Sequence, residues 1–129
     1  MSPAPDHILV VEDDPAYRRL VVRMLKGAGF AVSEADGFVS ALDLVEKEAS
    51  IDLLVMDIGM PAGTPHGISI VKMSRSRRAQ IGVVYMTGRD ADGMKEYADD
   101  APVLQKPFSA DALVQAVRGV LDRSRPDPK

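Results

Sequence analysis

The chain of 129 residues has no cysteine and no tryptophan, and only 5% of its residues are aromatic. The absence of cysteine excludes a disulfide framework and thiol chemistry. No apolar run approaches the length of a membrane-spanning helix, and the first residues lack the basic and apolar segments of a signal peptide. A net charge of -3 gives no indication of nucleic acid or an anionic membrane as a partner. We therefore expect a single cytoplasmic domain with an aliphatic core that binds neither a membrane nor nucleic acid.

Apolar segments suited to strands alternate along the chain with segments that have helical spacing. The predicted strands are 7–11, 30–33, 52–56, 81–86 and 103–105. The predicted helices begin at Asp14-Pro15 and after Ser109, and otherwise span 38–49, 67–78 and a short, glycine-interrupted segment at 90–98. This alternation predicts an α/β fold with a doubly wound parallel sheet and helices on both of its faces.

Capping residues mark the first and the last helix. Asp14 can accept a hydrogen bond at the start of the first helix, and Pro15 suits its first turn. Apolar residues recur in this helix at helical spacing, namely Tyr17, Leu20, Met24 and Ala28. Ser109 can cap the last helix. The predicted buried stripe of the last helix is Leu113, Ala116, Val117, Val120 and Leu121.

Carboxylates directly follow two of the predicted buried strands. Asp57 closes the third strand, and the cluster Glu12-Asp13-Asp14 closes the first. If the two strands are neighbours, they deliver these acids to one edge of the sheet. Acids crowded there would repel one another unless a hard cation lay between them.

Two further polar residues follow strands in the same way. Thr87 comes directly after the fourth strand, and Lys106 with Pro107 comes directly after the fifth. In open parallel sheets, ligands bind beyond the carboxyl ends of the strands. Together with the acids, these residues predict a phosphorylation site.

Four motifs, each after a predicted strand, resemble those of response-regulator receiver domains of two-component signalling. They are Val10-Val11-Glu12-Asp13-Asp14, Val55-Met56-Asp57-Ile58-Gly59-Met60-Pro61, Met86-Thr87-Gly88 and Gln105-Lys106-Pro107-Phe108. The similarity extends over nearly the whole chain. It implies a flavodoxin-like fold of five parallel strands in the order 2-1-3-4-5.

The resemblance implies that Asp57 is the phosphoacceptor and forms an acyl phosphate. Asp13 and Asp57 would bind Mg²⁺ directly, together with the backbone carbonyl of Gly59, while Glu12 would act mainly through water. Mg²⁺ suits such a site because it keeps several waters and needs few carboxylates, and Mn²⁺ could replace it. Asp14 is interpreted as the helix cap rather than as a ligand.

The resemblance also assigns roles to the residues that follow the last two strands. The Thr87 hydroxyl would donate a hydrogen bond to the incoming phosphoryl group, and Lys106 would pair with it. The Lys106-Pro107 peptide bond is expected to be cis, a geometry that proline makes accessible. Gly59 and Arg89 would flank the path of the hydrolytic water and so set the lifetime of the phosphoryl group.

The chain departs from the usual receiver pattern at three places. The loop at 60–67 is longer than usual, and the interval from Thr87 to Lys106 is shorter, which predicts a shortened fourth helix. Val103 stands where receivers commonly have Phe or Tyr, and its β-branched side chain has a stiff χ1. We therefore expect activation to involve the loop containing Gly88 instead of an aromatic rotamer flip. The motifs are similar to those of an alphaproteobacterial receiver subgroup that is paired with HWE-type histidine kinases.

The predicted organisation is an N-terminal extension at 1–6, a receiver domain at 7–122, a disordered tail at 123–129 and no output domain. Such a stand-alone receiver would take a phosphoryl group from a histidine kinase or a histidine phosphotransfer protein. It would act on an unidentified downstream protein, as a monomer or weak dimer. It would not be an enzyme beyond its own phosphorylation and dephosphorylation.

Two alternative functions were weighed against this prediction. A pseudo-receiver that never accepts phosphate is disfavoured by the complete set of acids. A phosphatase of the haloacid-dehalogenase type also uses Asp, Thr and Lys, but it needs a second acid where Gly59 stands. His7 and His66 are interpreted as structural residues. A solvated helix face is the interpretation of a basic group in the third helix, namely Lys72, Arg75, Arg77 and Arg78.

Overall fold

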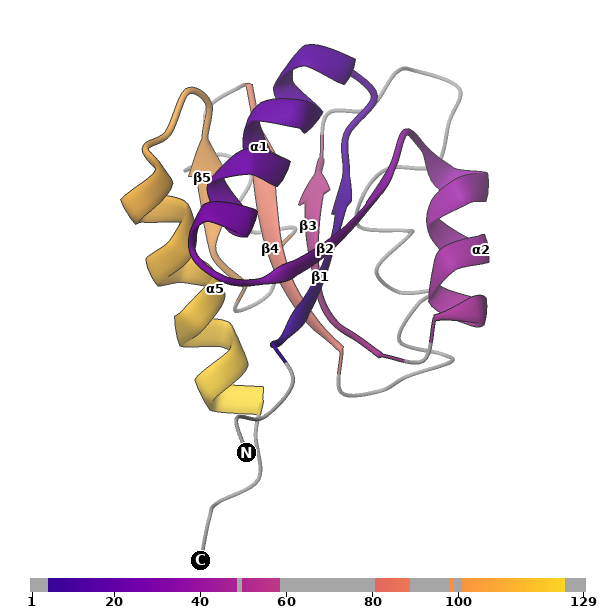
Figure 1. Cartoon of the computed structure of the whole chain (residues 1–129). Helices are drawn as coiled ribbons and strands as arrows, with labels where there is room; N and C mark the ends of the chain where they lie inside the picture. Colours follow the sequence, from indigo (N-terminus) through magenta and orange to yellow (C-terminus); the bar gives the residue numbers. More distant parts are fainter. Residues whose placement is uncertain (1–4, 49, 59–80, 89–97, 99–100, 125–129) are drawn as a thin grey trace, which may run out of the picture.

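The computed structural model describes residues 5–48, 50–58, 81–88, 98 and 101–124 (Figure 1). The strands in this part of the chain are β1 (His7–Val11), β2 (Ala31–Ala35), β3 (Ile51–Asp57), β4 (Gly82–Thr87) and β5 (Val103–Gln105). The helices are α1 (Pro15–Gly27), α2 (Phe38–Lys47) and α5 (Ala110–Ser124). The predicted helices at 67–78 and 90–98 fall on residues outside the described ranges, apart from Ala98, so the shortened fourth helix stays a prediction.

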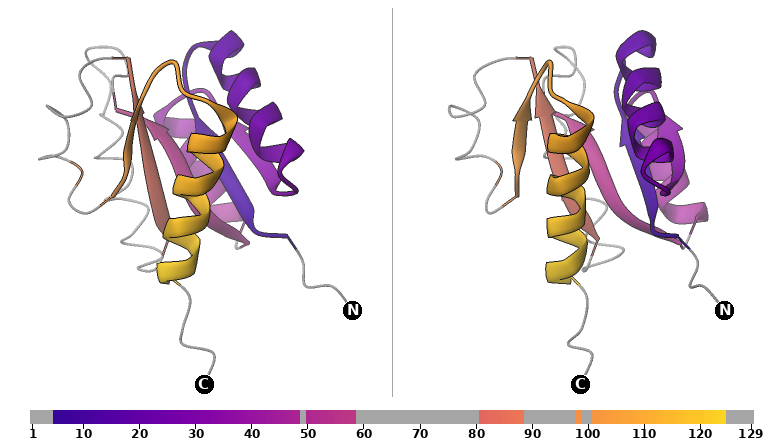
Figure 2. Two further views of the ribbon diagram at one scale, coloured as in Figure 1. Left: turned by 90° about the vertical axis from the view of Figure 1, so that its left-hand side faces the viewer. Right: turned by 60° about the vertical axis from the view of Figure 1, so that its left-hand side comes forward.

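The strands form one sheet in the order β2-β1-β3-β4-β5, with every neighbouring pair parallel. This order confirms the predicted flavodoxin-like topology. Helices α1 and α5 cover one face of the sheet, and α2 covers the other (Figures 1 and 2). None of the helices in the described residues is long and apolar enough to cross a membrane.

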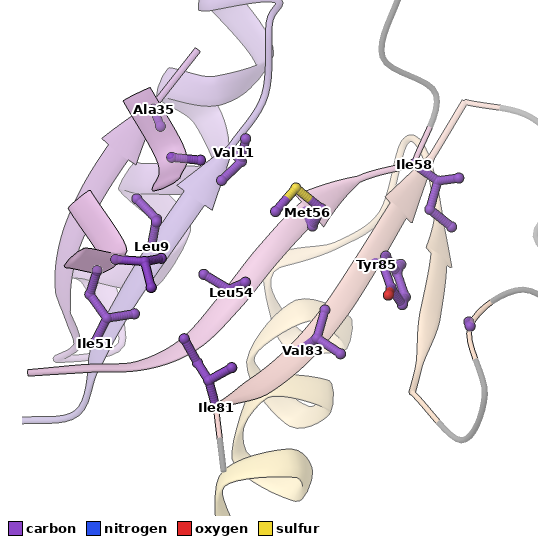
Figure 3. Packing of buried hydrophobic residues seen from close by; sticks show 13 residues of the cluster. Leu9, Val11, Ala35, Ile51, Leu54, Met56, Ile58, Ile81, Val83 and Tyr85 are labelled. Carbon is purple, nitrogen blue, oxygen red and sulfur yellow. The ribbon is translucent and has the colours of Figure 1, made fainter. Parts of the chain in front are cut away.

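The core consists of two hydrophobic clusters, one on each face of the sheet. Alternate residues of the central strands contribute to each cluster, because successive side chains of a strand point to opposite faces. On the α2 face lie Leu9, Val11, Leu54, Met56, Val83 and Tyr85 (Figure 3). On the α1 and α5 face lie Ile8, Val10, Leu53, Val55, Val84 and Met86. The uninterrupted apolar runs in the sequence are thus explained by strands that are buried on both sides.

The first helix is capped as predicted, and its buried face only partly overlaps the residues that have helical spacing. Asp14 Oδ1 accepts a hydrogen bond from the Ala16 N–H at 3.0 Å. Leu20, taken with its helically spaced neighbours to mark the apolar stripe, is 42% exposed. The residues that α1 buries are Val21, Val22 and Leu25. Tyr17 and Met24 are half-buried and pack against the same cluster. The most deeply buried residues are shifted around the helix because α1 docks against both the sheet and α5, and helical spacing alone does not show the direction of that docking.

Several element boundaries differ from the predictions. Asp57 and Thr87 are the last residues of β3 and β4 rather than the first residues after them. Strand β2 extends to Ala35, two residues beyond the predicted end. A charged residue such as Glu34 is tolerated in it because β2 is an edge strand that pairs only with β1. The cap of α5 is as predicted, with Ser109 Oγ accepting from the Ala112 N–H at 3.1 Å. Its predicted stripe is buried except for Ala116, which is half-buried. The helix extends to Ser124, beyond residue 122, where the receiver domain was predicted to end.

His7 has a structural environment at the opposite end of β1 from the acids. Its Nδ1 lies 2.8 Å from Ser50 Oγ, and its Nε2 lies 2.7 Å from Ser33 Oγ. The Ser33 hydroxyl also donates to Glu48 Oε2 at 3.0 Å. The ring therefore ties β1 to its two neighbouring strands, which agrees with the structural role predicted for it. His66 lies outside the described residues.

Gly82 is expected to be a poor site for alanine. A Cβ there would lie 2.7 Å from Val120 Cγ1, which belongs to a stiff β-branched side chain. We expect Gly82→Ala to lower the free energy of unfolding by about 1–2 kcal/mol, as in other overpacked cores. In a Val120→Ala background the same change is expected to be nearly neutral, because the clashing methyl group is gone. Denaturant titration of the single and double variants measures this coupling, and an equal loss in both backgrounds would contradict the steric explanation.

Candidate functional site

The candidate site lies at the carboxyl ends of the central strands. Glu12 directly follows β1, Asp57 ends β3 and Thr87 ends β4. Because β1, β3 and β4 are consecutive in the sheet and parallel, these ends meet at one edge. Lys106 follows β5 at the same edge. The sheet therefore brings together residues from four separate parts of the sequence.

Glu12, Asp13 and Asp57 form an acidic cluster at this edge. One carboxylate oxygen of each lies within 4.8 Å of those of the other two. Glu12 is 1% exposed and Asp57 is 5% exposed, whereas Asp13 is open to solvent. Carboxylate oxygens at this separation are the hard ligands that Mg²⁺ and Mn²⁺ prefer. The donor set therefore fits a divalent cation that keeps part of its water shell on the Asp13 side.

Lys106 places a positive charge in the acidic cluster. Its ammonium group donates hydrogen bonds to Glu12 Oε1 and, at 3.1 Å, to Asp57 Oδ2. The lysine is thus the counter-ion of both buried carboxylates. The sequence predicted that Lys106 would pair with a phosphoryl group, but not that it would bridge these two acids.

Burial and mutual charge shift the protonation equilibria of this cluster. Burial, reinforced by the charge of Asp57, raises the pKa of Glu12 to about 7, although the hydrogen bond from Lys106 works in the opposite direction. Burial by itself would lower the pKa of Lys106. The hydrogen bond to Glu12 and the charge of Asp57 outweigh that effect, and the pKa of Lys106 lies above its ordinary value. Lys106 is therefore a cation at neutral pH, whereas the pKa of Glu12 lies close to neutral pH.

The raised pKa of Glu12 predicts a pH-dependent stability in the absence of divalent metal. Folding raises this pKa from 4.5 to about 7, so the folded state binds the proton more tightly. The stabilisation is complete below pH 4.5 and is lost as the pH rises through about 7. We expect this loss to be on the order of 3 kcal/mol, because each pKa unit corresponds to about 1.4 kcal/mol.

Denaturant titration of the wild type and of Glu12→Gln between pH 4 and pH 8, both in EDTA, measures this contribution. A pKa shift of one unit corresponds to about 1.4 kcal/mol in the free energy of unfolding. The glutamine keeps the size and a hydrogen-bond acceptor but removes the titrating proton. The difference in free energy of unfolding between the two proteins should change across this window. A constant difference would show that Glu12 does not titrate there.

Arg18 fixes the turn that carries the two N-terminal acids. Its Nη1 donates to the backbone carbonyl of Glu12 at 2.8 Å, and its Nε donates to Glu34 Oε1 at 2.9 Å. The guanidinium group thereby ties the end of β1 to the end of β2. No role was predicted for Arg18, and its position one turn into a helix gives no sequence signal for this contact.

A family model for the response regulator receiver domain matches residues 8–118. The chain belongs to this family. Over 125 residues the receiver is 34% identical to the response regulator MprA of Mycobacterium leprae, a match that covers 93% of this chain and 53% of that protein. It spans about half the length of the curated relatives that it matches.

Solved structures of receivers have the same fold. The receiver protein of Sinorhizobium medicae has a TM-score of 0.85 at 26% identity, over 96% of this chain and 100% of that chain. The chemotaxis protein CheY4 of Vibrio cholerae has a TM-score of 0.79 at 29% identity, over 91% of this chain and 99% of that chain. The link to receivers paired with HWE-type kinases stays a prediction.

Four of the remaining predicted site residues belong to the part of the chain that the structure describes, namely Thr87, Gly88, Val103 and Pro107. Thr87 is buried, and its backbone carbonyl accepts from the Lys106 N–H at 2.8 Å. Val103 is half-buried and pairs with Tyr85 in the β4–β5 register. The Lys106-Pro107 peptide bond is cis, as predicted. Gly88 is exposed, and Gly59 and Arg89 lie outside the described residues, so their predicted roles stay predictions.

Proposed function

We propose that this receiver accepts a phosphoryl group on Asp57 from a histidine kinase or a histidine phosphotransfer protein. The observation that carries the proposal is the pairing of the buried Asp57 carboxylate with Lys106, 3.1 Å away, beside two further acids. A buried acid without a counter-ion would either be protonated or lower the stability of the folded state, because burying an unpaired charge costs free energy. Here the Lys106 ammonium group supplies the counter-charge of the carboxylate that would act as the nucleophile.

The proposed reaction is an in-line displacement at phosphorus. An oxygen of Asp57 forms the new bond to phosphorus as the bond to the donor breaks, and the donor keeps the electron pair of that bond. When the donor is phosphohistidine, the leaving imidazole nitrogen takes up that pair. The product on the receiver is an acyl phosphate at Asp57.

Two neighbouring residues are placed to stabilise the transferred group. Lys106 can exchange a carboxylate partner for a phosphoryl oxygen, because its ammonium group already lies next to Asp57. Thr87 ends the adjacent strand, where its hydroxyl would donate to a second phosphoryl oxygen. Both contacts compensate the negative charge that the transfer brings to a site already rich in carboxylates.

Glu12, Asp13 and Asp57 would hold Mg²⁺, with Asp13 and Asp57 as direct ligands and Glu12 acting mainly through water. The backbone carbonyl of Gly59 would complete the protein ligands, and Mn²⁺ has compatible ligand preferences. When bound, the ion supplies positive charge that neutralises the phosphoryl oxygens in the transition state. That the cluster already attracts the Lys106 ammonium group supports its affinity for cations.

The phosphorylated form would signal by altering the contacts of the receiver with a downstream protein. The proposed switch is the segment that follows Thr87 and contains Gly88 and Arg89, with Val103 taking no part through a rotamer flip. A cytoplasmic location and a monomeric or weakly dimeric state stay predictions.

Incubation with acetyl phosphate and Mg²⁺ tests the proposed function directly. The intact protein should gain one phosphoryl group, which resists acid but is removed by base or hydroxylamine, as expected of an acyl phosphate. Chelation of the metal should prevent the gain. A protein that remains unmodified with both acetyl phosphate and a phosphorylated histidine protein as donors would contradict phosphoacceptor function and support a pseudo-receiver.

A further inference from the structure

Tyr17, in the first turn of α1, contacts Lys106 of the candidate site. The Nζ of Lys106 lies 4.6 Å from the centroid of the Tyr17 ring, over its face. An ammonium group in this position is attracted by the negative potential of the ring face. Lys106 is thus held by Glu12, Asp57 and an aromatic ring at once.

The ring itself is fixed by Phe108, two residues after Lys106. The two rings meet edge to face, with centroids 5.8 Å apart and an interplanar angle of 89°. Both side chains pack against the hydrophobic cluster beneath α1 and α5. This edge-to-face geometry is favourable for aromatic pairs and holds the Tyr17 face toward the lysine.

The hydroxyl of Tyr17 is buried. The backbone of Phe108 acts on it as a hydrogen-bonding neighbour and so lowers the pKa of Tyr17, but the opposite effect of burial is larger. Burial raises the pKa of Tyr17, so the side chain is neutral at physiological pH. The contact between Tyr17 and Lys106 is therefore made by the face of a neutral ring.

A lysine at this site has to change partners during phosphoryl transfer. Lys106 has a flexible four-carbon stem, and its ammonium group would otherwise be free to follow either carboxylate or to turn toward water. The Tyr17 ring would contact the Lys106 ammonium group in the same way before and after phosphoryl transfer. A partner of this kind keeps the ammonium group within reach of Asp57 and limits the entropy lost when it meets the phosphoryl group.

We propose that Tyr17 is a positioning residue for phosphoryl transfer, which acts by holding the Lys106 ammonium group against its ring face. The inference rests on the proposed phosphoacceptor function of Asp57. In this proposal a side chain from the first turn of α1 contributes to the phosphoryl-transfer site itself, independently of any contact with a protein partner.

The contact itself is tested by NMR of the lysine side chain. The ε-methylene protons of Lys106 should be shifted upfield by the ring current of Tyr17. The shift should persist in Tyr17→Phe and disappear in Tyr17→Leu and Tyr17→Met, which both remove the ring. Phe30→Leu is the matched control, because it removes another ring from the same cluster, one that faces Arg118 at 6.0 Å. Equal Lys106 shifts in all variants would overturn the proposal.

The effect on chemistry is tested with acetyl phosphate as donor, so that docking of a protein partner plays no part. We expect phosphorylation to be about three- to ten-fold slower in Tyr17→Leu and Tyr17→Met, the range expected for a partly desolvated cation–π contact. Tyr17→Phe and Phe30→Leu should stay within about two-fold of the wild type, because the first keeps the ring face and the second lies away from Lys106.

A wild-type rate in both Tyr17→Leu and Tyr17→Met, or an equal loss in Phe30→Leu, would overturn the positioning role. Failure of the proposed function has a different signature, since wild-type protein would then take no label at all. In that case the ring-current comparison alone decides whether Tyr17 positions Lys106. Amide spectra establish that each variant is folded.

Discussion

Replacement of Asp57 by asparagine is expected to abolish phosphoryl labelling of the receiver. The amide is a far poorer nucleophile than a carboxylate, and an attack through its oxygen would not leave a stable acyl phosphate. Its similar size and its retained acceptor oxygen leave the packing at the end of β3 nearly unchanged. Labelling by acetyl phosphate and by a phosphorylated histidine protein, followed by intact mass and peptide mapping, measures the effect.

Asp52→Asn is the matched control for this experiment. Asp52 belongs to the same strand but lies at its other end, exposed, where its Oδ2 accepts from the His7 N–H at 2.8 Å. An asparagine carbonyl can accept the same hydrogen bond, so this variant should be labelled like the wild type. Label that persists in Asp57→Asn would place the acceptor on another residue. Loss of label in Asp52→Asn would point to a general effect of charge.

Replacement of Asp13 by asparagine is expected to weaken Mg²⁺ binding by roughly a hundred-fold, because changes outside the direct ligands already cost about 10- to 100-fold at metal sites. Asp13 is the exposed member of the acidic cluster, and its charge is not compensated by the hydrogen bonds of Lys106. It is therefore the carboxylate that an incoming cation reaches first. Because the chain has no tryptophan, amide NMR during a Mg²⁺ titration is the appropriate measurement.

Asp14→Asn separates loss of a ligand from loss of charge in the same loop. Asp14 is exposed and caps α1 through its contact with the Ala16 N–H, and asparagine is an equally good cap. It removes the same charge one residue away, so we expect only a small, salt-dependent loss of affinity. If the two variants lost affinity equally, Asp13 would act through the local potential rather than as a ligand.

The central strands and the helix caps could be predicted from the sequence because their signals are local. Strands β1, β3 and β4 are nearly unbroken apolar runs, which is the pattern of a strand buried on both faces. Asp14-Pro15 and Ser109 are residue types suited to a helix start, and the structure shows both caps in use. These signals lie within a few residues of the features that they determine.

The orientation of α1 could not be predicted in the same way. Helical spacing shows that a helix forms, but Leu20 and Val21 differ by only about 100° around the axis. The choice of Val21, Val22 and Leu25 as the buried face depends on the simultaneous contact of α1 with the sheet and with α5. Such a choice is made by packing between distant segments.

The sequence by itself determined which residues meet at the carboxyl edge, since the acids, Thr87 and Lys106 each follow or end a strand. Only the tertiary structure decided how they interact. Lys106 and Glu12 are 94 positions apart and follow strands that are not neighbours in the sheet, yet they form a hydrogen bond. The raised pKa of Glu12 and the ring of Tyr17 over Lys106 arise from the same packing. Strand formation depends on local periodicity, whereas burial and electrostatic coupling depend on all the segments that surround a group.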